Sequence, residues 1–266
     1  LVLPLFFGFA GGTNFIVLAA VGGTTASTLT AAFFLWKQGI KPWGGFSREV
    51  AREAIVLGLK GHVGRIANML NWRLDLMLLS FFAPVSVVGN YAIASKVAEL
   101  FRPISASLTF VLRPVIASLT VQEARVRGVE LYRRFFAINL GAILLMALCG
   151  PTAIRYFFGP EFEPAVIAFQ ILLIGLAAHG ADGVINGYNV GIGRPEFNSY
   201  TALVGLVVTI IGDFAFIPTY SIYGAAWVSS VAYTAKAVAM TVIFLSTSGV
   251  SWRQLAGFEE YSPDAA

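Results

Sequence analysis

Long apolar runs separated by short polar turns constrain this chain more than any other feature. Most runs approach the roughly 20 residues that a helix needs to cross a bilayer. They lack the strict alternation of barrel strands, and a bilayer admits only helices or closed barrels. Only 12% of the residues are charged, against about 25% in an average soluble domain. The sequence therefore predicts an all-α integral membrane protein.

Run lengths predict a polytopic helix bundle of about seven full transmembrane helices. A partial segment over the first eleven residues, "LVLPLFFGFAG", resembles the end of an earlier span, so we expect the chain to be a fragment. The predicted spans are 14–36, 54–82, 90–118, 135–153, 164–189, 198–217 and 223–246.

Cations in alternate loops predict the orientation. The loops at 37–53 and 119–134 are rich in Lys and Arg, and 190–197 and the tail carry one Arg each, whereas 83–89 and 218–224 carry none. The positive-inside rule then places the basic loops and the C-terminus in the cytoplasm of a multi-pass cell-membrane protein. We expect residues 42–53 to begin an interfacial helix and the tail after residue 250 to be disordered.

Ionisable residues within apolar runs are functional candidates, because each costs about 2.5–3.5 kcal/mol at mid-helix. Lys60 and Arg113 lie near cytoplasmic ends, where snorkelling explains them. The remaining cations outnumber the acids by one, which suits an anionic ligand such as a pyrophosphate. The acids could alternatively bind Na⁺ or H⁺. The cations are Arg65, Arg73, Lys96, Arg102 and Lys236, and the acids are Asp75, Glu99, Asp182 and Asp213.

Helical phase separates two of these charges. At about 100° per residue, Arg65, Asn68, Asn71, Trp72 and Asp75 share one third of the helix, whereas Arg73 lies about 160° from Asp75. Antiparallel pairing about the turn near residue 86 sets Asp75 level with Lys96 and Arg73 level with Glu99. Only one of the two pairs can face the 90–118 span, so we expect one of Arg73 and Asp75 to clamp two helices and the other to line a path. The polar stripe favours Asp75 on the path, and Pro103 predicts a kink in the next span.

A second polar stripe runs through "HGADGVINGYN", where spacings of 3, 4 and 3 set four side chains on one face. Surrounding glycines would permit close helix contact, so a polar helix interface and the wall of a water-filled cavity remain equally open. The stripe consists of His179, Asp182, Asn186 and Asn189. Asp213 lies near an external helix end, where we expect it to be solvated.

Other functional classes find little support. The single cysteine, Cys149, lies in an apolar run, and no metal-ligand spacing occurs. The loop cations follow the topology, so nucleic acid is not an expected partner. We expect neither a metal nor another cofactor.

Three stretches resemble the polysaccharide and oligosaccharide-unit flippases. Their superfamily also holds the multidrug and toxic compound extrusion transporters and the lipid II flippases, and the resemblance covers roughly residues 58–233. The stretches are "GLKGHVGRIANMLNWRLDLMLLSFFAPVSVVGNYAIASKVAEL", "YFFGPEFEPAVIAFQILLIG" and "GIGRPEFNSYTALVGLVVTIIGDFAFIPTYSIYGAAWVSSVAY".

This resemblance implies a transporter of two lobes that flips a polyprenyl-pyrophosphate-linked oligosaccharide to the external leaflet by alternating access. Residues 1–53 would be the end of the first lobe and a cytoplasmic linker, 54–250 the second lobe, and 251–266 a tail. Membrane lipids, a coupling cation (H⁺ or Na⁺) and polysaccharide polymerisation machinery are the further expected partners.

Within that hypothesis Arg73, Lys96 and Arg102 contact the pyrophosphate or sugar, while Asp75 and Glu99 position them or bind the coupling ion. The alternatives are a cation-coupled multidrug exporter and, as an enzyme, a membrane-embedded glycosyl- or acyltransferase. The short external loops, with only Glu161 and Glu163 as acids, disfavour the enzyme. The predicted substrate-binding or path-lining residues are Arg65, Asn68, Asn71, Arg73, Asp75, Lys96, Glu99, Arg102, Asp182, Asn186 and Lys236.

Overall fold

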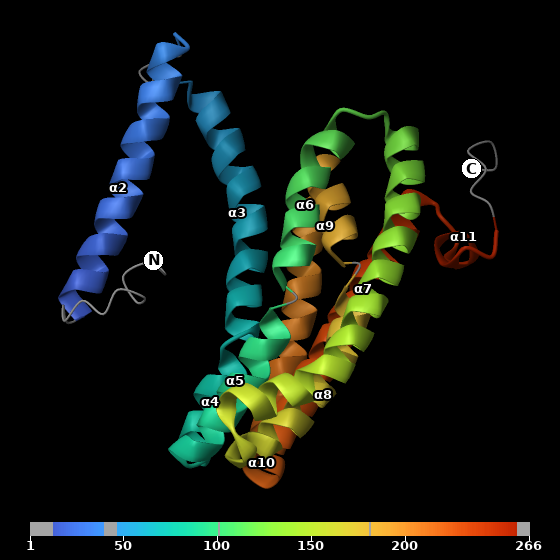
Figure 1. Ribbon diagram of the computed structural model, residues 1–266. Helices are drawn as coiled ribbons and strands as arrows, with labels where there is room; N and C mark the ends of the chain where they lie inside the picture. The colour runs from blue at the N-terminus through green and yellow to red at the C-terminus, as the bar shows by residue number, and fades with distance from the viewer. Residues whose placement is uncertain (1–12, 40–46, 101, 181, 260–266) are drawn as a thin grey trace. The chain divides into compact units, whose positions relative to one another are not determined.

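The computed structural model describes residues 13–39, 47–100, 102–180 and 182–259 (Figure 1). Every regular element within those ranges is a helix, so the all-α prediction is confirmed. The helices are α2 (Thr13–Lys37), α3 (Arg48–Asn71), α4 (Leu74–Phe82), α5 (Val85–Glu99), α6 (Arg102–Ala117), α7 (Val121–Phe158), the 3₁₀ turn η1 (Pro160–Phe162), α8 (Glu163–His179), α9 (Asp182–Gly191), α10 (Glu196–Ser248) and α11 (Trp252–Ala256).

Contacts divide the chain into two compact units, Leu1–Ile55 and Val56–Ala266. The first contains α2, whose described side chains from Val21 onward are all exposed. The second contains the helices from the middle of α3 to α11, and it carries both apolar cores and the candidate site.

Within the described part of the chain, three segments are long and apolar enough to cross a membrane: Val121–Phe158, Pro160–Gly191 and Glu196–Ser248. In α7 the stretch 135–154 contains no charged residue, and 20 residues at 1.5 Å each give about 30 Å, the thickness of a hydrocarbon core. The helix nevertheless begins at Val121, where Thr120 and Glu123 form a capping box. The expectation of a loop over 119–134 is therefore wrong, because a helix can continue beyond the membrane.

Helix α10 is a hairpin of two arms that meet at Ser221, whose φ of 53° and ψ of −131° are not helical. A Cβ on Gly212 would lie 2.6 Å from Val228, and one on Gly205 would lie 3.5 Å from Lys236. These contacts make the arms antiparallel, and their extents match the predicted spans 198–217 and 223–246.

Among the described residues, two apolar cores lie at opposite ends of α7 and of the second α10 arm. One contains Phe169 of α8 and Ile217 of α10, and the other contains Tyr188 of α9 and Phe244 of α10. Along the chain, polar residues fall between the two sets: Asn139 in α7, His179 and Asp182 at the α8–α9 junction, and Lys236 in α10. The interior of the second unit therefore consists of an apolar core at each end and a polar layer between them.

Two predicted spans are not continuous helices. The span 54–82 breaks between α3 and α4, where Arg73 has φ −125°. The span 90–118 breaks where α5 ends at Glu99. In a continuous helix the N–H of residue 103 would donate to the carbonyl of Glu99, but Pro103 has no N–H. The second break was predicted from the proline, and no helix-breaking residue signals the first.

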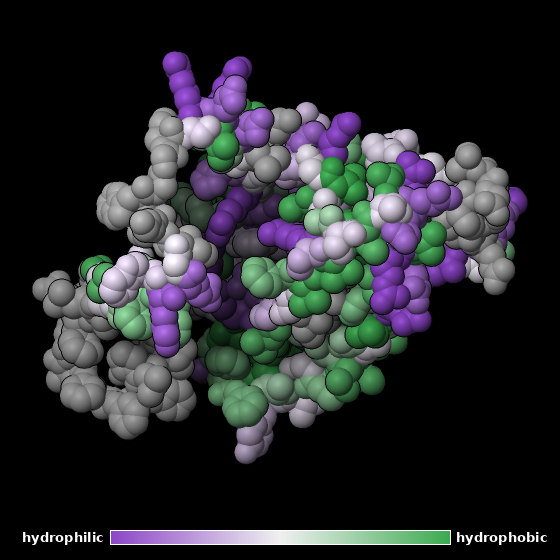
Figure 2. Space-filling model, turned by 90° about the horizontal axis from the view of Figure 1, so that it is seen from above, coloured by the Kyte–Doolittle hydropathy of each residue, from purple (hydrophilic) through white to green (hydrophobic). Residues whose placement is uncertain are grey.

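The tail does not match its expectation of disorder. Ser251 and Gln254 form the capping box of α11, and Leu255 is buried in the core that contains Phe244. Residues 260–266, residues 42–46 of the 42–53 segment and the partial N-terminal segment lie outside the described residues, and residues 48–53 form the start of α3. Seen from the end at which α6 turns into α7, apolar side chains cover much of the face of the second unit (Figure 2).

Candidate functional site

Asp75 is the centre of a buried cluster formed by α4, α5 and α10. Its carboxylate accepts hydrogen bonds from the Tyr91 hydroxyl at 2.5 Å, the Ser229 hydroxyl at 3.1 Å and the Leu76 backbone N–H at 2.7 Å. Both hydroxyl-bearing residues are also buried. The contact with Tyr91 makes Asp75 a clamp between α4 and α5, the role that helical phase had favoured for Arg73.

Asp213 is fully buried, with 0% of its surface exposed. Neither carboxylate oxygen has a hydrogen-bond partner within the described residues. The expectation that Asp213 is solvated at a helix end is therefore wrong, because the α10 hairpin covers it. An isolated buried carboxylate is strongly disfavoured unless a proton or a cation compensates it.

A small cavity of about 20 Å³ lies beside Asp75. It is large enough for about one water molecule. Its lining includes Trp72, Tyr91, Glu99 and Tyr233. The cavity could admit a water or a bare ion, and it is far too small for an oligosaccharide.

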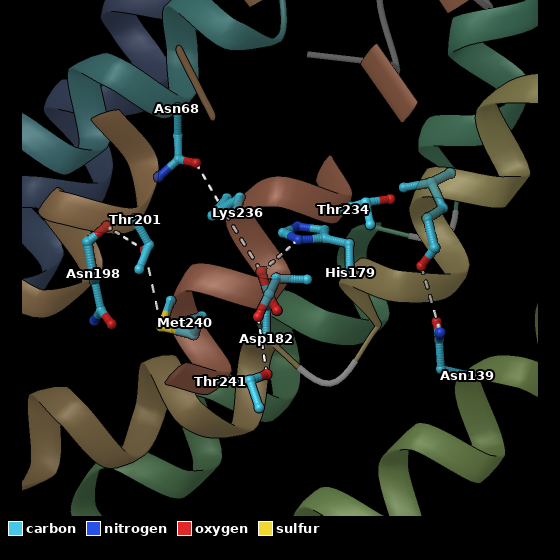
Figure 3. Close-up of polar contacts among 12 residues, drawn as sticks. Asn68, Asn139, His179, Asp182, Asn198, Thr201, Thr234, Lys236, Met240 and Thr241 are labelled. Carbon is cyan, nitrogen blue, oxygen red and sulfur yellow. Dashed lines mark hydrogen bonds and ion pairs between the residues drawn. The ribbon is translucent and has the colours of Figure 1, made fainter. Parts of the chain in front are cut away.

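Lys236 is the centre of a second network (Figure 3), with 6% of its surface exposed. Its ammonium donates to Asn68 Oδ1 at 3.0 Å and lies 3.9 Å from Asp182 Oδ2. The same oxygen of Asp182 is 2.7 Å from His179 Nδ1, and the imidazole stacks on Tyr233. The network joins α3, α8, α9 and α10 and pairs opposite charges, as burial demands.

Helix α3 runs parallel to the first arm of α10. The Ser199 hydroxyl accepts from the Gly64 N–H at 3.0 Å, and further along the Thr209 hydroxyl donates to Asn71. That arm belongs to an apolar segment long enough to cross a membrane. Arg65 follows Gly64 and Arg73 lies two residues after Asn71, so both arginines are at the level of this segment.

The cross-helix ion pairs expected for Asp75 with Lys96 and for Arg73 with Glu99 are wrong. Lys96 instead pairs with Glu99 on its own helix at 2.9 Å. The prediction assumed one continuous helix through residues 72–73, and the break between α3 and α4 changes the phase of everything after it.

The predicted surplus of buried cations is also wrong for the described residues. Arg65, Arg73 and Lys96 are exposed, which leaves Lys236 as the buried cation of that set. Asp75, Asp182 and Asp213 are all buried. Among the described members of the set, three acids and Lys236 lie in the interior, and the other three cations lie on the surface. The side chains of Lys60 and Arg102 lie outside the described part of the chain.

The second polar stripe is a helix interface. Asn189 is buried and donates to Asn198 Oδ1 at 2.8 Å, and Asn198 donates to the Asn186 carbonyl at 3.2 Å. These bonds join α9 to α10. Asn139 of α7 donates to the Ala177 carbonyl near the end of α8 at 3.0 Å (Figure 3).

Several residues of the site were not among the predicted ones. Tyr91 and Ser229 carry no charge and stand in ordinary apolar contexts, so no sequence signal distinguishes them. Thr209 and Asp213 are one helical turn apart, a spacing that could have indicated a shared polar face. No group of three or more His, Cys, Asp or Glu side chains suited to a metal ion occurs among the described residues.

Comparison with known proteins identifies the family. Residues 13–167 match the family model described as polysaccharide biosynthesis protein. An uncharacterised membrane protein of Methanocaldococcus jannaschii is 27% identical over 190 residues, which cover 68% of this chain and 37% of the relative. The chain thus spans well under half of that relative.

Two solved structures share the fold. A MOP superfamily transporter from Pyrococcus furiosus, reported with a binding pocket of reversed polarity, gives a TM-score of 0.59 at 16% identity. An outward-facing multidrug-resistance transporter of the MATE family, in the same superfamily, gives 0.56 at 17% identity. Each alignment covers 76% of this chain and 47% of the other. The chain therefore belongs to the polysaccharide biosynthesis protein family and shares the fold of two transporters of the MOP superfamily.

Proposed function

We propose that this chain is part of a flippase that moves a polyprenyl-pyrophosphate-linked oligosaccharide from the cytoplasmic to the external leaflet by alternating access. The family supports a role in polysaccharide biosynthesis, and the shared fold supports transport. The relatives are about twice as long, so the second unit would supply one lobe of the transporter.

The observation that carries the proposal is the exposure of Arg65 and Arg73 at the level of the first α10 arm, together with the exposure of Lys96 on α5. Charged side chains within a membrane face water or protein in preference to lipid. A row of cations beside an aqueous path suits a pyrophosphate, which accepts charge-assisted hydrogen bonds.

The buried acids suit a coupling cation. Asp213 lacks a compensating group, and Asp75 lies close enough to influence it electrostatically. A proton or Na⁺ held there would be released when the arms of α10 separate from α4. The proposal thus assigns the surface cations to the substrate and the interior acids to the coupling ion.

The proposed setting is the cell membrane with a cytoplasmic C-terminus. Arg133 and Arg134 mark one end of the charge-free stretch of α7 and Arg155 the other. The larger cationic cluster, 125–134, favours the cytoplasm for the first end. Polymerisation machinery would take up the flipped unit on the far side.

A proteoliposome assay tests the function. Full-length protein is reconstituted with a fluorescent polyprenyl-pyrophosphate oligosaccharide, and an impermeant quencher reports its transfer between leaflets. We expect Arg73→Gln to slow transfer at least tenfold. Arg127→Gln, which removes an exposed Arg paired with Glu130 outside the apolar stretch, should leave it unchanged. Equal transfer by all three proteins would contradict the role of the cations.

The acid-rich interior favours a second candidate, a cation-coupled multidrug exporter. Efflux of a fluorescent lipophilic cation, measured with and without a Na⁺ gradient in the same liposomes, separates the two functions. Efflux of the dye without transfer of the lipid-linked sugar would select the exporter.

A further inference from the structure

The C-terminal helix α11 lies at a defined depth along α7. The charge-free stretch of α7 runs from Phe135 to Ile154 and is about 30 Å long, which matches a hydrocarbon core. Arg133 directly precedes it. The Arg133 guanidinium donates to the backbone carbonyls of Leu255 at 3.2 Å, Glu259 at 3.2 Å and Gln254. These bonds hold α11 at the edge of the core.

One side of α11 faces the protein. Val250 and Leu255 are buried in the core that contains Phe244. Gly257, at φ 92°, ends the helix and turns the chain back on itself, a conformation that a side chain would strain. The turn brings Phe258 to Trp252, with ring centroids 6.1 Å apart.

The other side of α11 is apolar, aromatic and uncovered. Trp252 is 60% exposed and Phe258 is 76% exposed, although they are large rings. The Arg253 guanidinium lies 5.7 Å from the Trp252 ring and 3.4 Å from the Glu259 carboxylate. Arg134, next to Arg133 in sequence, pairs with Glu130 at 2.5 Å, and both Arg134 and Arg253 stay more than half exposed beside these acids. Aromatic rings beside cations are typical of the layer between hydrocarbon and water.

We propose that α11 and the turn after it form an anchor that binds the anionic headgroup layer of the leaflet nearest Arg133. Trp252 and Phe258 enter the boundary between headgroups and acyl chains, and Arg253 and Arg134 contact lipid phosphates. Depth, aromatic character and charge complementarity each point to lipid as the occupant. The anchor would fix the end of the second α10 arm, four residues earlier, relative to the bilayer.

Depth-dependent quenching in nanodiscs tests the anchor. Cys149, the single cysteine, is replaced by Ala, and one cysteine is introduced for an environment-sensitive fluorophore. The test position is Trp252→Cys. Leu144→Cys, in the middle of the charge-free stretch, marks the membrane interior, and Val121→Cys, twelve residues before Arg133, marks water. Both reference side chains are exposed, so labelling leaves the packing intact.

We expect the fluorophore at position 252 to lose most of its emission to lipids with a nitroxide near the headgroup. The fluorophore at 144 should lose it to nitroxides deep in the acyl chains, and the one at 121 only to aqueous iodide. Quenching at 252 that matches position 121 would overturn the anchor.

Lipid charge gives the second arm of the test. Phosphatidylglycerol, added to phosphatidylcholine, should increase headgroup quenching at 252, and the Arg253→Gln variant should lose that increase. Glu161→Gln at the opposite end of α7 should retain it. Quenching that is independent of phosphatidylglycerol would overturn the assignment to anionic lipid.

Discussion

At the scale of single residues, the site separates charges by burial. Asp75 has three donors, whereas the fully buried Asp213 has none among the described residues. Exposed Arg65 and Arg73 lie on the helices that carry Asn71 and Asp75 inward. Two ligands of opposite charge could therefore act on the same part of the fold without competing for one site.

Replacement of Asp213 should abolish cation-dependent stability. We expect NaCl, compared with choline chloride at equal ionic strength, to raise the melting temperature of the purified protein by about 5–10 °C near saturation. If the ion is H⁺, the same rise should accompany a fall in pH from 8 to 6, because protonation neutralises the buried carboxylate. Asp213→Asn should lose the effect, and the surface control Glu163→Gln should retain it. Wild-type protein that responds to neither ion would contradict a coupling site at Asp213.

Removal of the Tyr91 hydroxyl should show how much the Asp75 clamp between α4 and α5 contributes to stability. Tyr91→Phe keeps the ring and removes the donor at 2.5 Å, so we expect a loss of about 1–3 kcal/mol in the free energy of unfolding. Tyr156→Phe, at an exposed position of α7, should change it by less than about 0.5 kcal/mol. Denaturant titration of both variants in the same detergent provides the measurement, and equal stabilities would show that the clamp is unimportant.

The sequence indicated which charged residues belong to the site, but it did not indicate which residues they contact. The cost of charge in a membrane was enough to select Asp75, Asp182 and Lys236, and all three are buried and engaged. Their partners depended on the break between α3 and α4, which no Gly or Pro marks. Helical phase is reliable only within one continuous helix, and the expected Asp75–Lys96 pair failed for that reason.

At the scale of helices, close packing depends on glycine at particular positions. A Cβ on Gly175 of α8 would lie 2.5 Å from the Ser230 Cα of α10, and the Ser230 hydroxyl donates to the Ile171 carbonyl at 2.6 Å. The backbone of the second α10 arm therefore lies directly against α8. Small residues allow such an approach where lipid offers no hydrophobic drive.

Insertion of one methyl group should separate these helices. Gly175→Ala must displace backbone atoms, so we expect a loss of about 1–3 kcal/mol in stability. Gly141→Ala is the matched control: it lies in α7, with nothing within 4 Å of the added Cβ, and should be neutral or slightly stabilising. The two melting temperatures, measured in one detergent, decide the matter. A Gly175→Ala protein as stable as the control would mean that the two backbones are not in contact.

Apolar runs do not predict where helices begin and end. The predicted span 135–153 lies within α7, yet the helix begins fourteen residues before Phe135. A hydropathy pattern reports the thickness of the bilayer and not the extent of hydrogen bonding. In α10 the polar turn at 218–224 predicted the division into two arms, although both arms belong to the single element Glu196–Ser248.

At the scale of the whole molecule, the distribution of cations predicts one topology. With Cys149 replaced, an impermeant maleimide should label Val85→Cys and Glu161→Cys in intact cells. Val121→Cys and Ser251→Cys should react only after permeabilisation, because α7 begins and α10 ends on the cytoplasmic side. All four side chains are exposed. Labelling of Ser251→Cys in intact cells would invert the proposed orientation.

The central claim is that exposed cations on α3 and α4 bind the pyrophosphate of a lipid-linked oligosaccharide during its transfer. The most direct measurement replaces the native protein with Arg73→Gln in its own host and quantifies surface polysaccharide together with the lipid-linked precursor. At equal protein level, we predict loss of the polymer and accumulation of precursor on the cytoplasmic leaflet, with Arg127→Gln indistinguishable from wild type. Normal polymer and no accumulated precursor in the Arg73→Gln cells would contradict the claim.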